Sequence, residues 1–588
     1  MIAPPLTPFP MRILMGRIAH EWGTRNRIFD LPIARFWSPE PDVDLSMSFL
    51  GRPAATPLGP AAGPHSQMAQ NIVLAWLGGA RMFELKTVQI LDDLEISRPC
   101  IDMQTIGYNI EWSQELKVHQ SLEEYVKAWM AIEMLRRWDP ISEHIGDAGP
   151  HVFDMSVGYD LAGISSDKIA AFIDGLMDAS AEIDRLRPEI PEPFAQWRDF
   201  EFPTRIADTV TLSTFHGCPP EEIEGITKHL MTRHQVDVVV KLNPTLLGHE
   251  RVSEIVNDML DYDFVQLDPK AFDDDLQFER GIQLIGELRD FARVNGRRFG
   301  IKLTNTLVVR NHKGFMPDDP MYLSGPPLHV LAMTLLDRLS ASLPGVLQPH
   351  GGDVQVSFSA GVTRDNVSET VGVGVAPATI CSDLLKPGGY GRLAPMLKRL
   401  AEDMRAVGAT SLDEWRTHAA RTAERDGYRS AAQHHVARML SGDERKIYHR
   451  EANEKLPREV DHTLQMWGCV ACNFCVTVCP NDAFFRLPTP EDSGLDGRQQ
   501  YLVFTELCNE CGNCMVFCPE DGDPAMIKPR LFLDRERFDL VEGQAFFVNH
   551  TNGDLRIEAK PGWKDEVPML TRLLTASEGL PVRISDLG

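Results

Sequence analysis

The sequence predicts an α/β protein with a (β/α)8 barrel, followed by a helical linker and a smaller cysteine-rich domain. Two observations carry this prediction. Short apolar runs alternate with helical patterns over about residues 40–390, which is typical of parallel strands joined by crossover helices. Near the end of the chain, eight of the eleven cysteines gather in two runs of the same spacing. An open doubly wound sheet is the alternative for the first part.

The composition limits the class of protein. A chain of 588 residues is too long for one ordinary domain, and 43% hydrophobic and 24% charged residues are globular values. The net charge of −25 argues against nucleic acid or an anionic membrane as partner. We expect no membrane span, because no apolar run approaches about 20 residues. We expect no secretory signal, because prolines break the start MIAPPLTPFPMRILMGRIAHEW and it has no long apolar stretch. Clustered cysteines fit metal ligation in a reducing compartment, so we expect a cytoplasmic protein.

Nine segments of the first part are candidate strands. A barrel needs eight, so one of the nine is expected to be an insertion or a false prediction. In chain order they are PLGPAAG (57–63), MFELKTV (82–88), VFDMSVGY (152–159), VTLSTF (210–215), DVVVKLNP (237–244), FVQLD (264–268), FGIKLTNTLVV (299–309), VQVSFSAG (354–361) and PATICSD (377–383).

Helix signals lie between these strands and after them. Residues 121–138 begin with a capping box from Ser121 to Glu124, and residues 219–234 begin with two prolines. In the linker, Ser411 and Glu414 form a second capping box. The predicted divisions are an N-terminal extension (1–40), the barrel (41–390), the helical linker (391–460), the cysteine-rich domain (461–545), and a C-terminal hairpin and tail (546–588) that turns near Asn552-Gly553.

The two cysteine runs share the spacing C-x2-C-x2-C-x3-C-P. They consist of Cys469, Cys472, Cys475 and Cys479, and of Cys508, Cys511, Cys514 and Cys518. This is the spacing of a bacterial-type 2[4Fe-4S] ferredoxin, in which the fourth cysteine of each run ligates the other cluster. We therefore expect one cluster on Cys469, Cys472, Cys475 and Cys518, and the second on Cys508, Cys511, Cys514 and Cys479. Zinc, the alternative, demands neither the doubled spacing nor the two prolines.

Small or polar residues follow many predicted strands, as in "AAGP", "KT", "HGCPP", "KLNP", "TNT" and "SAG". Such residues suit a phosphate-bearing planar cofactor at the carboxyl ends of the strands. At these motifs the sequence resembles the FMN barrel of dihydroorotate and dihydropyrimidine dehydrogenases. The latter also carry a ferredoxin after the barrel. Overall the chain looks most like the selenate reductase subunit family, without the FAD/pyridine-nucleotide module of those longer proteins: no G-x-G-x-x-G follows a strand here.

The resemblance implies a set of flavin contacts. Lys86 and Thr87 would hold the polar edge of the ring, and Lys241 would supply a positive charge to reduced flavin. Backbone at Ala61, Ala62 and Gly63 would approach the ring closely. The ribityl chain and phosphate would be cradled by Gly325, Ala360, Gly361, Cys381 and Ser382.

The resemblance also implies substrate and acid positions, with departures. Asn305 and Thr306 match substrate-amide positions, whereas Asp160 and Thr211 stand where the family has asparagine. Neither replacement can copy the pattern of an amide, which donates from its NH2 group and accepts at its carbonyl oxygen, so uracil or dihydroorotate is not implied. Thr214 stands at the position of the proton-transferring cysteine or serine. Cys218 lies four residues on, with His216 between them, and we prefer Cys218 narrowly as the acid.

Two hypotheses on function remain open. In the first, the chain is an oxidoreductase that passes electrons between two [4Fe-4S] clusters and FMN to reduce, or oxidise, a carbon–carbon bond of a cyclic amide or N-heterocycle. A separate FAD/NAD(P)H-binding subunit, resembling the small subunit of glutamate synthase, would supply the electrons. In the second, the barrel is a scaffold within an electron-transfer subunit of a larger NAD(P)H-linked or molybdenum oxidoreductase. The sequence leaves the substrate, the direction of flow and the oligomeric state open.

Overall fold

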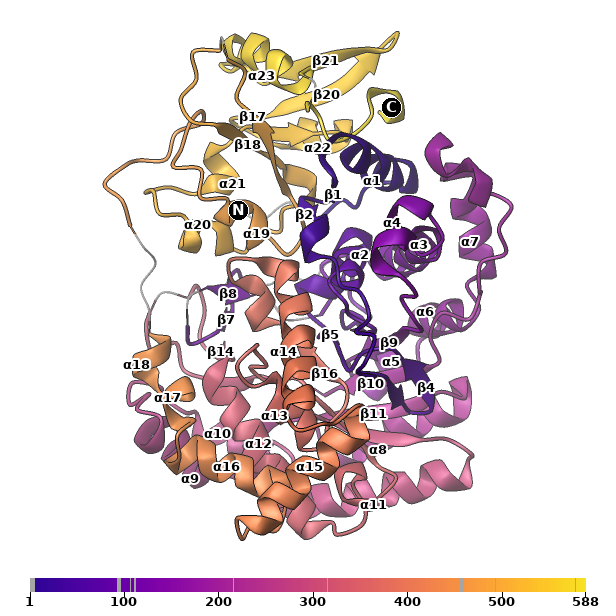
Figure 1. Cartoon of the computed structure of the whole chain (residues 1–588), viewed down its shortest axis with the longest axis vertical. Helices are drawn as coiled ribbons and strands as arrows, with labels where there is room; N and C mark the ends of the chain where they lie inside the picture. Colours follow the sequence, from indigo (N-terminus) through magenta and orange to yellow (C-terminus); the bar gives the residue numbers. More distant parts are fainter. Residues whose placement is uncertain are drawn as a thin grey trace.

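The computed structural model describes residues 6–92, 97–105, 107–109, 113–214, 216–314, 316–454, 459–491, 493–576 and 578–587. In Figure 1 the barrel and its helices form the larger, lower part, and the yellow C-terminal sheet forms the smaller, upper part. Among the described helices, none combines the length and the apolar character that a membrane span requires.

The first part is a (β/α)8 barrel, as predicted. Eight strands pair in parallel in the order β5-β16-β15-β12-β11-β10-β9-β6, and the amide of Arg81 donates to the carbonyl of Leu58 (3.0 Å) where the first and last strands meet. Five of the longer strands are buried along their whole length or nearly so, which explains why they read as apolar runs. The strands are β5 (Leu58–Pro60), β6 (Met82–Glu84), β9 (Val152–Val157), β10 (Thr209–Ser213), β11 (Asp237–Leu242), β12 (Phe299–Leu303), β15 (Gln355–Phe358) and β16 (Ala378–Ile380).

The ninth candidate, residues 264–268, is not a barrel strand. It makes a single isolated bridge, from Leu267 to Val309. The candidate 299–309 divides into β12 and β13 (Leu307–Val309), and β13 belongs to a separate sheet of order β13-β14-β7-β8. The other members are β14 (Met321–Leu323), β7 (Ile101–Asp102) and β8 (Tyr108–Asn109).

Helices surround the barrel, and one predicted start is wrong. The helix α3 begins at Val118 instead of Ser121, so Glu124 lies inside this helix and does not form its capping box. Its buried carboxylate accepts a hydrogen bond from the amide of Ala69 (2.8 Å) and pairs with Lys127, so a tertiary contact replaces the capping box. The main covering helices are α2 (Ala69–Leu77), α3 (Val118–Leu135), α6 (Asp167–Met177), α8 (Pro220–His229), α11 (Phe278–Val294) and α12 (Pro326–Ser342).

The linker is helical and packs on the barrel. Ser411 accepts from the amide of Glu414 (3.3 Å), as its capping box predicts, and Trp415 donates from its ring to the carbonyl of Ser368 (2.8 Å). The linker helices are α14 (Leu393–Ala406), α15 (Leu412–Arg425), α16 (Ala431–Ser441), α17 (Arg445–Tyr448) and α18 (Arg450–Asn453).

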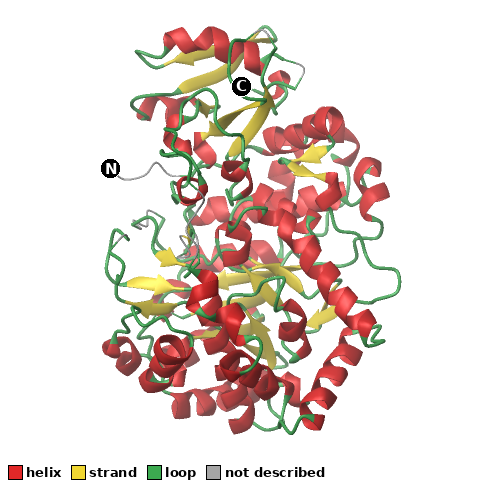
Figure 2. Cartoon of the chain, turned by 60° about the vertical axis from the view of Figure 1, so that its left-hand side comes forward, coloured by secondary structure: helices red, strands yellow, loops and turns green. Residues whose placement is uncertain are grey.

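A five-stranded sheet of order β17-β18-β19-β20-β21 carries the cysteine loops (Figure 2). Asn552 and Gly553 form the turn between its last two strands, so the C-terminal hairpin extends this sheet instead of standing apart from it. The strands are β17 (Phe484–Pro488), β18 (Gln499–Phe504), β19 (Arg530–Phe532), β20 (Phe546–Thr551) and β21 (Asp554–Ala559).

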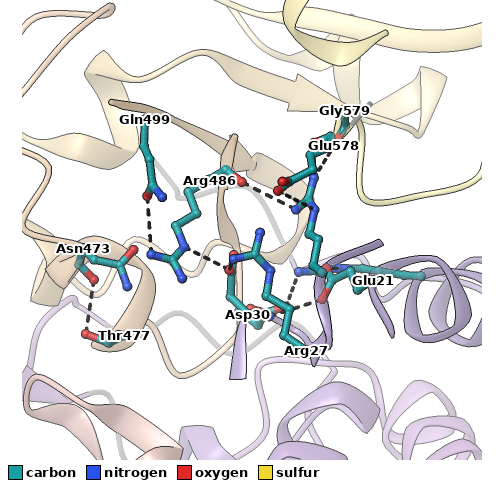
Figure 3. A network of polar contacts seen from close by, with 12 residues as sticks. Glu21, Arg27, Asp30, Asn473, Thr477, Arg486, Gln499, Glu578 and Gly579 are labelled. Atoms are coloured by element: carbon teal, nitrogen blue, oxygen red, sulfur yellow. Dashed lines mark hydrogen bonds and ion pairs between the residues drawn. The ribbon is translucent and has the colours of Figure 1, made fainter. Parts of the chain in front are cut away.

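The N-terminal segment joins the two parts. Helix α1 (Met11–Arg25) and the segment before it pack into the core of the C-terminal sheet, where the rings of Phe9 and Phe504 meet edge to face with centroids 5.2 Å apart. Buried Arg17 pairs with Asp482 (2.6 Å). Figure 3 shows the neighbouring contacts, in which Asp30 lies between Arg27 and Arg486. The predicted extension is therefore part of the interface between barrel and sheet.

Candidate functional site

A cavity of about 560 Å³ lies at the mouth of the barrel, which we call the barrel cavity. Its lining residues lie at or just after the carboxyl ends of all eight strands, where (β/α)8 enzymes carry their active sites. Twelve of the residues predicted from the sequence line it: Ala62, Thr87, Asp160, Thr214, His216, Lys241, Asn305, Thr306, Ala360, Gly361, Cys381 and Ser382. Six others do not: Ala61, Gly63, Lys86, Thr211, Cys218 and Gly325.

The loop backbone at the cavity requires two glycines. Gly361 has a φ of +52°, and a Cβ there would lie 2.4 Å from the carbonyl oxygen of Gly325. Gly325 has a φ of +80°, and its Cβ would lie 1.9 Å from the carbonyl oxygen of Met103. Both positions therefore tolerate only glycine. Gly325 is not among the lining residues, although its neighbour Ser324 is, so its contact with a flavin stays a prediction.

Thr211 lies below the mouth, inside the barrel. Its hydroxyl donates to Asp154 Oδ2 (2.6 Å), and Thr209 donates to the other oxygen of the same carboxylate (2.6 Å). Because both threonines lie on β10 and alternate residues of a strand share a face, one aspartate engages both. The predicted role of Thr211 in substrate binding is therefore not supported by its position.

Asp154 gives the barrel a pH-dependent stability. Burial raises its pKa to about 7, against the lowering effect of the two threonine hydrogen bonds. A carboxyl with a higher pKa in the folded state binds its proton more tightly there than in the unfolded state. Its contribution to the free energy of unfolding is therefore complete below the unfolded pKa and is lost as the pH rises through the folded pKa.

We expect the free energy of unfolding, measured in urea, to fall by about 4 kcal/mol between pH 4 and pH 7 because of Asp154. Asp154→Asn should remove that part of the pH dependence. Parallel pH profiles for the two proteins would contradict the assignment.

Beside Asp154, a buried ion pair crosses the barrel. Lys302 Nζ lies 2.5 Å from Glu84 Oε2, both side chains are 2% exposed, and Thr379 Oγ1 lies 2.8 Å from the same nitrogen. Burial raises the pKa of Glu84, but Lys302 and then Lys241 outweigh it and hold that pKa below its usual value. Thr379, which accepts from Lys302, also lines the barrel cavity, so the ion pair lies directly behind the cavity lining.

His216 is held at the cavity by a carboxylate. Its Nδ1 atom donates to Asp275 Oδ2 (3.0 Å), its ring stacks on Tyr322 at 6.2 Å, and Thr245 also donates to Asp275 (2.7 Å). Burial raises the pKa of Asp275, yet the hydrogen bond from His216 and the other donors bring it below its usual value. Asp275 is 4% exposed and is absent from the sequence prediction. It orients the imidazole as carboxylates do in catalytic dyads.

Cys218, the preferred acid from the sequence, points elsewhere. It is 4% exposed and its Sγ lies 3.9 Å from the carbonyl of Pro219. Burial, followed by the charges of Glu222 and Asp275, raises its pKa to about 12. Thr214 does line the cavity, but its hydroxyl donates to the carbonyl of Lys241 (3.1 Å).

Asn305 and Asp160 are both fixed in place. The amide nitrogen of Asn305 donates to Asn243 Oδ1 (2.7 Å) and to the carbonyl of Thr214 (3.2 Å). This leaves its Oδ1 as the atom able to accept from a ligand. Asp160 accepts from the amide of Gly163 (2.7 Å) as the cap of α5 (Leu161–Ile164).

The eight cysteines separate into two groups. One small cavity is lined by a first group, made of Cys469, Cys472, Cys475 and Cys518. The second group is Cys479, Cys508, Cys511 and Cys514. Burial is the main cause that raises the pKa of Cys479 to about 12, and the neighbouring Cys511 is the next. Burial likewise raises the pKa of Cys508 to about 12, and Cys479 is the next cause. The members of this group therefore lie close enough to affect one another. In each group the fourth cysteine comes from the other run.

The second group lies against two segments that lead to the barrel cavity. On one side, Gln70 and Asn71 of α2 donate to Asn481, both at 3.2 Å, two residues after Cys479. On the other side, Arg98 donates to the carbonyl of Asn509 (2.6 Å), and Ile101, three residues later, lines the barrel cavity. The segment from Arg98 to Ile101 therefore contacts the loop of the second group at one end and lines the barrel cavity at the other.

Comparison with known proteins identifies both parts. Residues 29–430 match the model of the oxidoreductase YgfK N-terminal TIM-barrel domain, and residues 468–521 match a 4Fe-4S dicluster domain. The YgfK protein of Escherichia coli (strain K12) is 38% identical over 424 residues, which cover 67% of this chain and 39% of YgfK. The chain thus spans about two fifths of the length of that relative.

Two further similarities are weaker. An uncharacterized iron-sulfur protein of Methanocaldococcus jannaschii, MJ0092, is 27% identical over 92 residues, covering 13% of this chain and 19% of that protein. Ligand-free DHODH from Eimeria tenella covers 68% of this chain and 97% of its own at 14% identity, with a TM-score of 0.41. The family match over 29–430 carries the assignment: the chain belongs to the YgfK oxidoreductase family, whose N-terminal TIM barrel it joins to a 4Fe-4S dicluster domain.

Proposed function

We propose that the chain is an iron–sulfur flavoprotein subunit in which electrons pass between two [4Fe-4S] clusters and FMN in the barrel cavity. The observation that carries this proposal is that the segment from Arg98 to Ile101 contacts the loop of the second cysteine group and lines the barrel cavity. The first group would hold one cluster on Cys469, Cys472, Cys475 and Cys518. The second group would hold the other on Cys479, Cys508, Cys511 and Cys514.

The residues at the barrel cavity fit FMN. A volume of about 560 Å³ lies within the range of roughly 300–1,000 Å³ of cofactor sites. Thr87 and Lys241 would hold the polar edge of the ring and its negative charge, and Ala62 would give close backbone approach. Ala360, Gly361, Cys381 and Ser382 would hold the ribityl chain and phosphate. When bound, FMN exchanges single electrons with clusters and passes electrons in pairs to a substrate.

We propose His216 as the proton donor in place of Cys218. Asp275 fixes its ring through Nδ1, which leaves Nε2 as the atom that would carry the proton toward a substrate carbon. Asn305, with its free Oδ1, would accept from a ring N–H, and the aromatic rim of Tyr159 and Tyr322 suits a flat ring. A cyclic amide or N-heterocycle therefore remains the proposed substrate class.

The proposed electron source is a separate FAD/NAD(P)H-binding subunit in the cytoplasm, where thiols stay reduced. The test is re-oxidation. FMN-loaded protein is reduced with dithionite under argon, freed of excess reductant, and mixed with a panel of cyclic amides and N-heterocycles. Return of flavin absorbance with one or more compounds supports an enzyme. Clusters that load fully while no compound oxidises the flavin would favour the scaffold function instead.

His216→Asn is expected to lower turnover of the best compound by about 10²–10⁴-fold at pH 7, the usual worth of a general acid. Asp275→Asn, which loosens the ring without removing it, should reduce turnover less and shift the pH profile. Cys218→Ser is the matched control and should stay close to the wild type. If Cys218→Ser were inactive while His216→Asn kept full rate, the roles would have to be exchanged.

A further inference from the structure

A second cavity of about 560 Å³ lies where three parts of the chain meet. We call it the junction cavity. Phe29 and Arg35 line it from the N-terminal segment, Arg364 and Arg392 from the barrel side, and Cys479 and Arg486 from the cysteine-bearing domain. It shares no lining residue with the barrel cavity.

Two of its four guanidinium groups have no partner within the described residues. Asp383 holds Arg392 through two hydrogen bonds (2.8 and 2.9 Å), and Asp30 holds Arg486 (3.3 Å). Figure 3 shows that second contact. By contrast, the side chains of Arg35 and Arg364 are exposed and make neither a hydrogen bond nor an ion pair with any described residue.

The acidic residues of the junction cavity are largely neutralised. Asp30 also pairs with Arg27 (2.9 Å), Asp482 pairs with Arg17 (2.6 Å), and Asp383 is engaged by Arg392. Only Asp365, which is exposed, lacks such a cation in the described part of the chain. In a chain of net charge −25, this cavity therefore presents two guanidinium groups without partners against one carboxylate without an ion pair, among the described residues.

One wall of the junction cavity is apolar. Leu31, Val476 and Met396 line it together with the ring of Tyr390, whose hydroxyl donates to the carbonyl of Pro480 (2.7 Å). The hydrogen bond fixes the ring, so this wall is preformed. An apolar wall with a few charged groups at one side is the usual construction of a site for a ring-bearing anion.

We propose that the junction cavity binds a nucleotide diphosphate, with its base against the apolar wall and its phosphates at Arg35 and Arg364. Guanidinium groups match phosphate oxygens in charge and in fork geometry. Because Cys479 lines the same cavity, the bound nucleotide lies against the second cysteine group. The diphosphate belongs either to a free nucleotide or to half of a dinucleotide, and the chemistry of recognition is the same.

The test is calorimetric titration of the anaerobic, cluster-reconstituted full chain, saturated with FMN, with ADP, FAD and inorganic phosphate. ADP should bind at about one per chain. The double variant Arg35→Ala/Arg364→Ala should bind it at least about tenfold more weakly, since each charged contact is worth that much. Asp365→Asn, which removes the one unneutralised acid, should bind ADP more tightly. Unchanged cluster absorbance would show that the variants fold.

FAD binding more tightly than ADP would identify the ligand as a dinucleotide, and equal or weaker binding as a free nucleotide. A second readout is the electron paramagnetic resonance of the reduced clusters, which ADP should perturb in the wild type and not in the double variant. The proposal fails if ADP does not bind, if phosphate alone binds as tightly, or if the double variant binds normally. These results are independent of whether FMN occupies the barrel, because both arginines lie outside the barrel cavity.

Discussion

Glu84→Gln is expected to lower the free energy of unfolding by about 3–5 kcal/mol, since it leaves a buried lysine without its partner. Glu84 and Lys302 are each 2% exposed, and the lysine has one other partner, the hydroxyl of Thr379. Lys302→Met should cost a similar amount, because Glu84 would lose its nearest cation and keep Lys241, the weaker of the two.

The two changes together should cost much less than their sum, because neither leaves the other charge unpaired. Urea unfolding followed by circular dichroism measures all three proteins. Glu402→Gln is the matched control: its partner Lys398 is 69% exposed, and such surface pairs contribute little. Single and double variants whose costs simply add would show that the pair is not coupled.

Cys508→Ala is expected to slow the reduction of the flavin by a one-electron donor more than roughly 10–100-fold. That range is the usual cost of losing a residue that only supports a metal ligand, and Cys508 is a proposed ligand itself. The physical reason is the position of Cys508 relative to the barrel cavity. Cys508 belongs to the group nearest the barrel cavity, whereas the cavity of the first group is lined by Val470, which is 43% exposed. Electrons that enter at the exposed group would have no next site.

Stopped-flow absorbance, with iron analysis to count clusters, tests this prediction. Photoreduction by free deazaflavin, which reaches the flavin directly, serves as the control and should stay close to the wild-type rate. A variant that keeps the iron of two clusters, or reduces flavin at the normal rate, would contradict the proposed ligand group.

The sequence predicted the barrel because its strands are buried on both faces and therefore read as apolar runs. The same rule misled at residues 264–268, where Val265 is buried in a loop that forms no ladder. The grouping of the cysteines followed from spacing alone, since ligands close in sequence are constrained by local geometry.

The proposed acid site was harder to predict because it depends on contacts between distant segments. His216 and Asp275 are 59 residues apart, and the aspartate stands in an ordinary acidic run. The contact of Thr211 with Asp154 could not be predicted, because a family position fixes a residue on a strand but not the partner of its side chain. The junction cavity combines three segments, so no local pattern could indicate it.

The most direct test of the central claim is the FMN content of the reconstituted chain. The protein is loaded with iron, sulfide and FMN under argon, passed over a desalting column, and denatured so that released flavin fluorescence can be measured against the iron content. The account predicts about one FMN and eight iron atoms per chain. Full iron with no FMN retained would contradict a flavin in the barrel cavity.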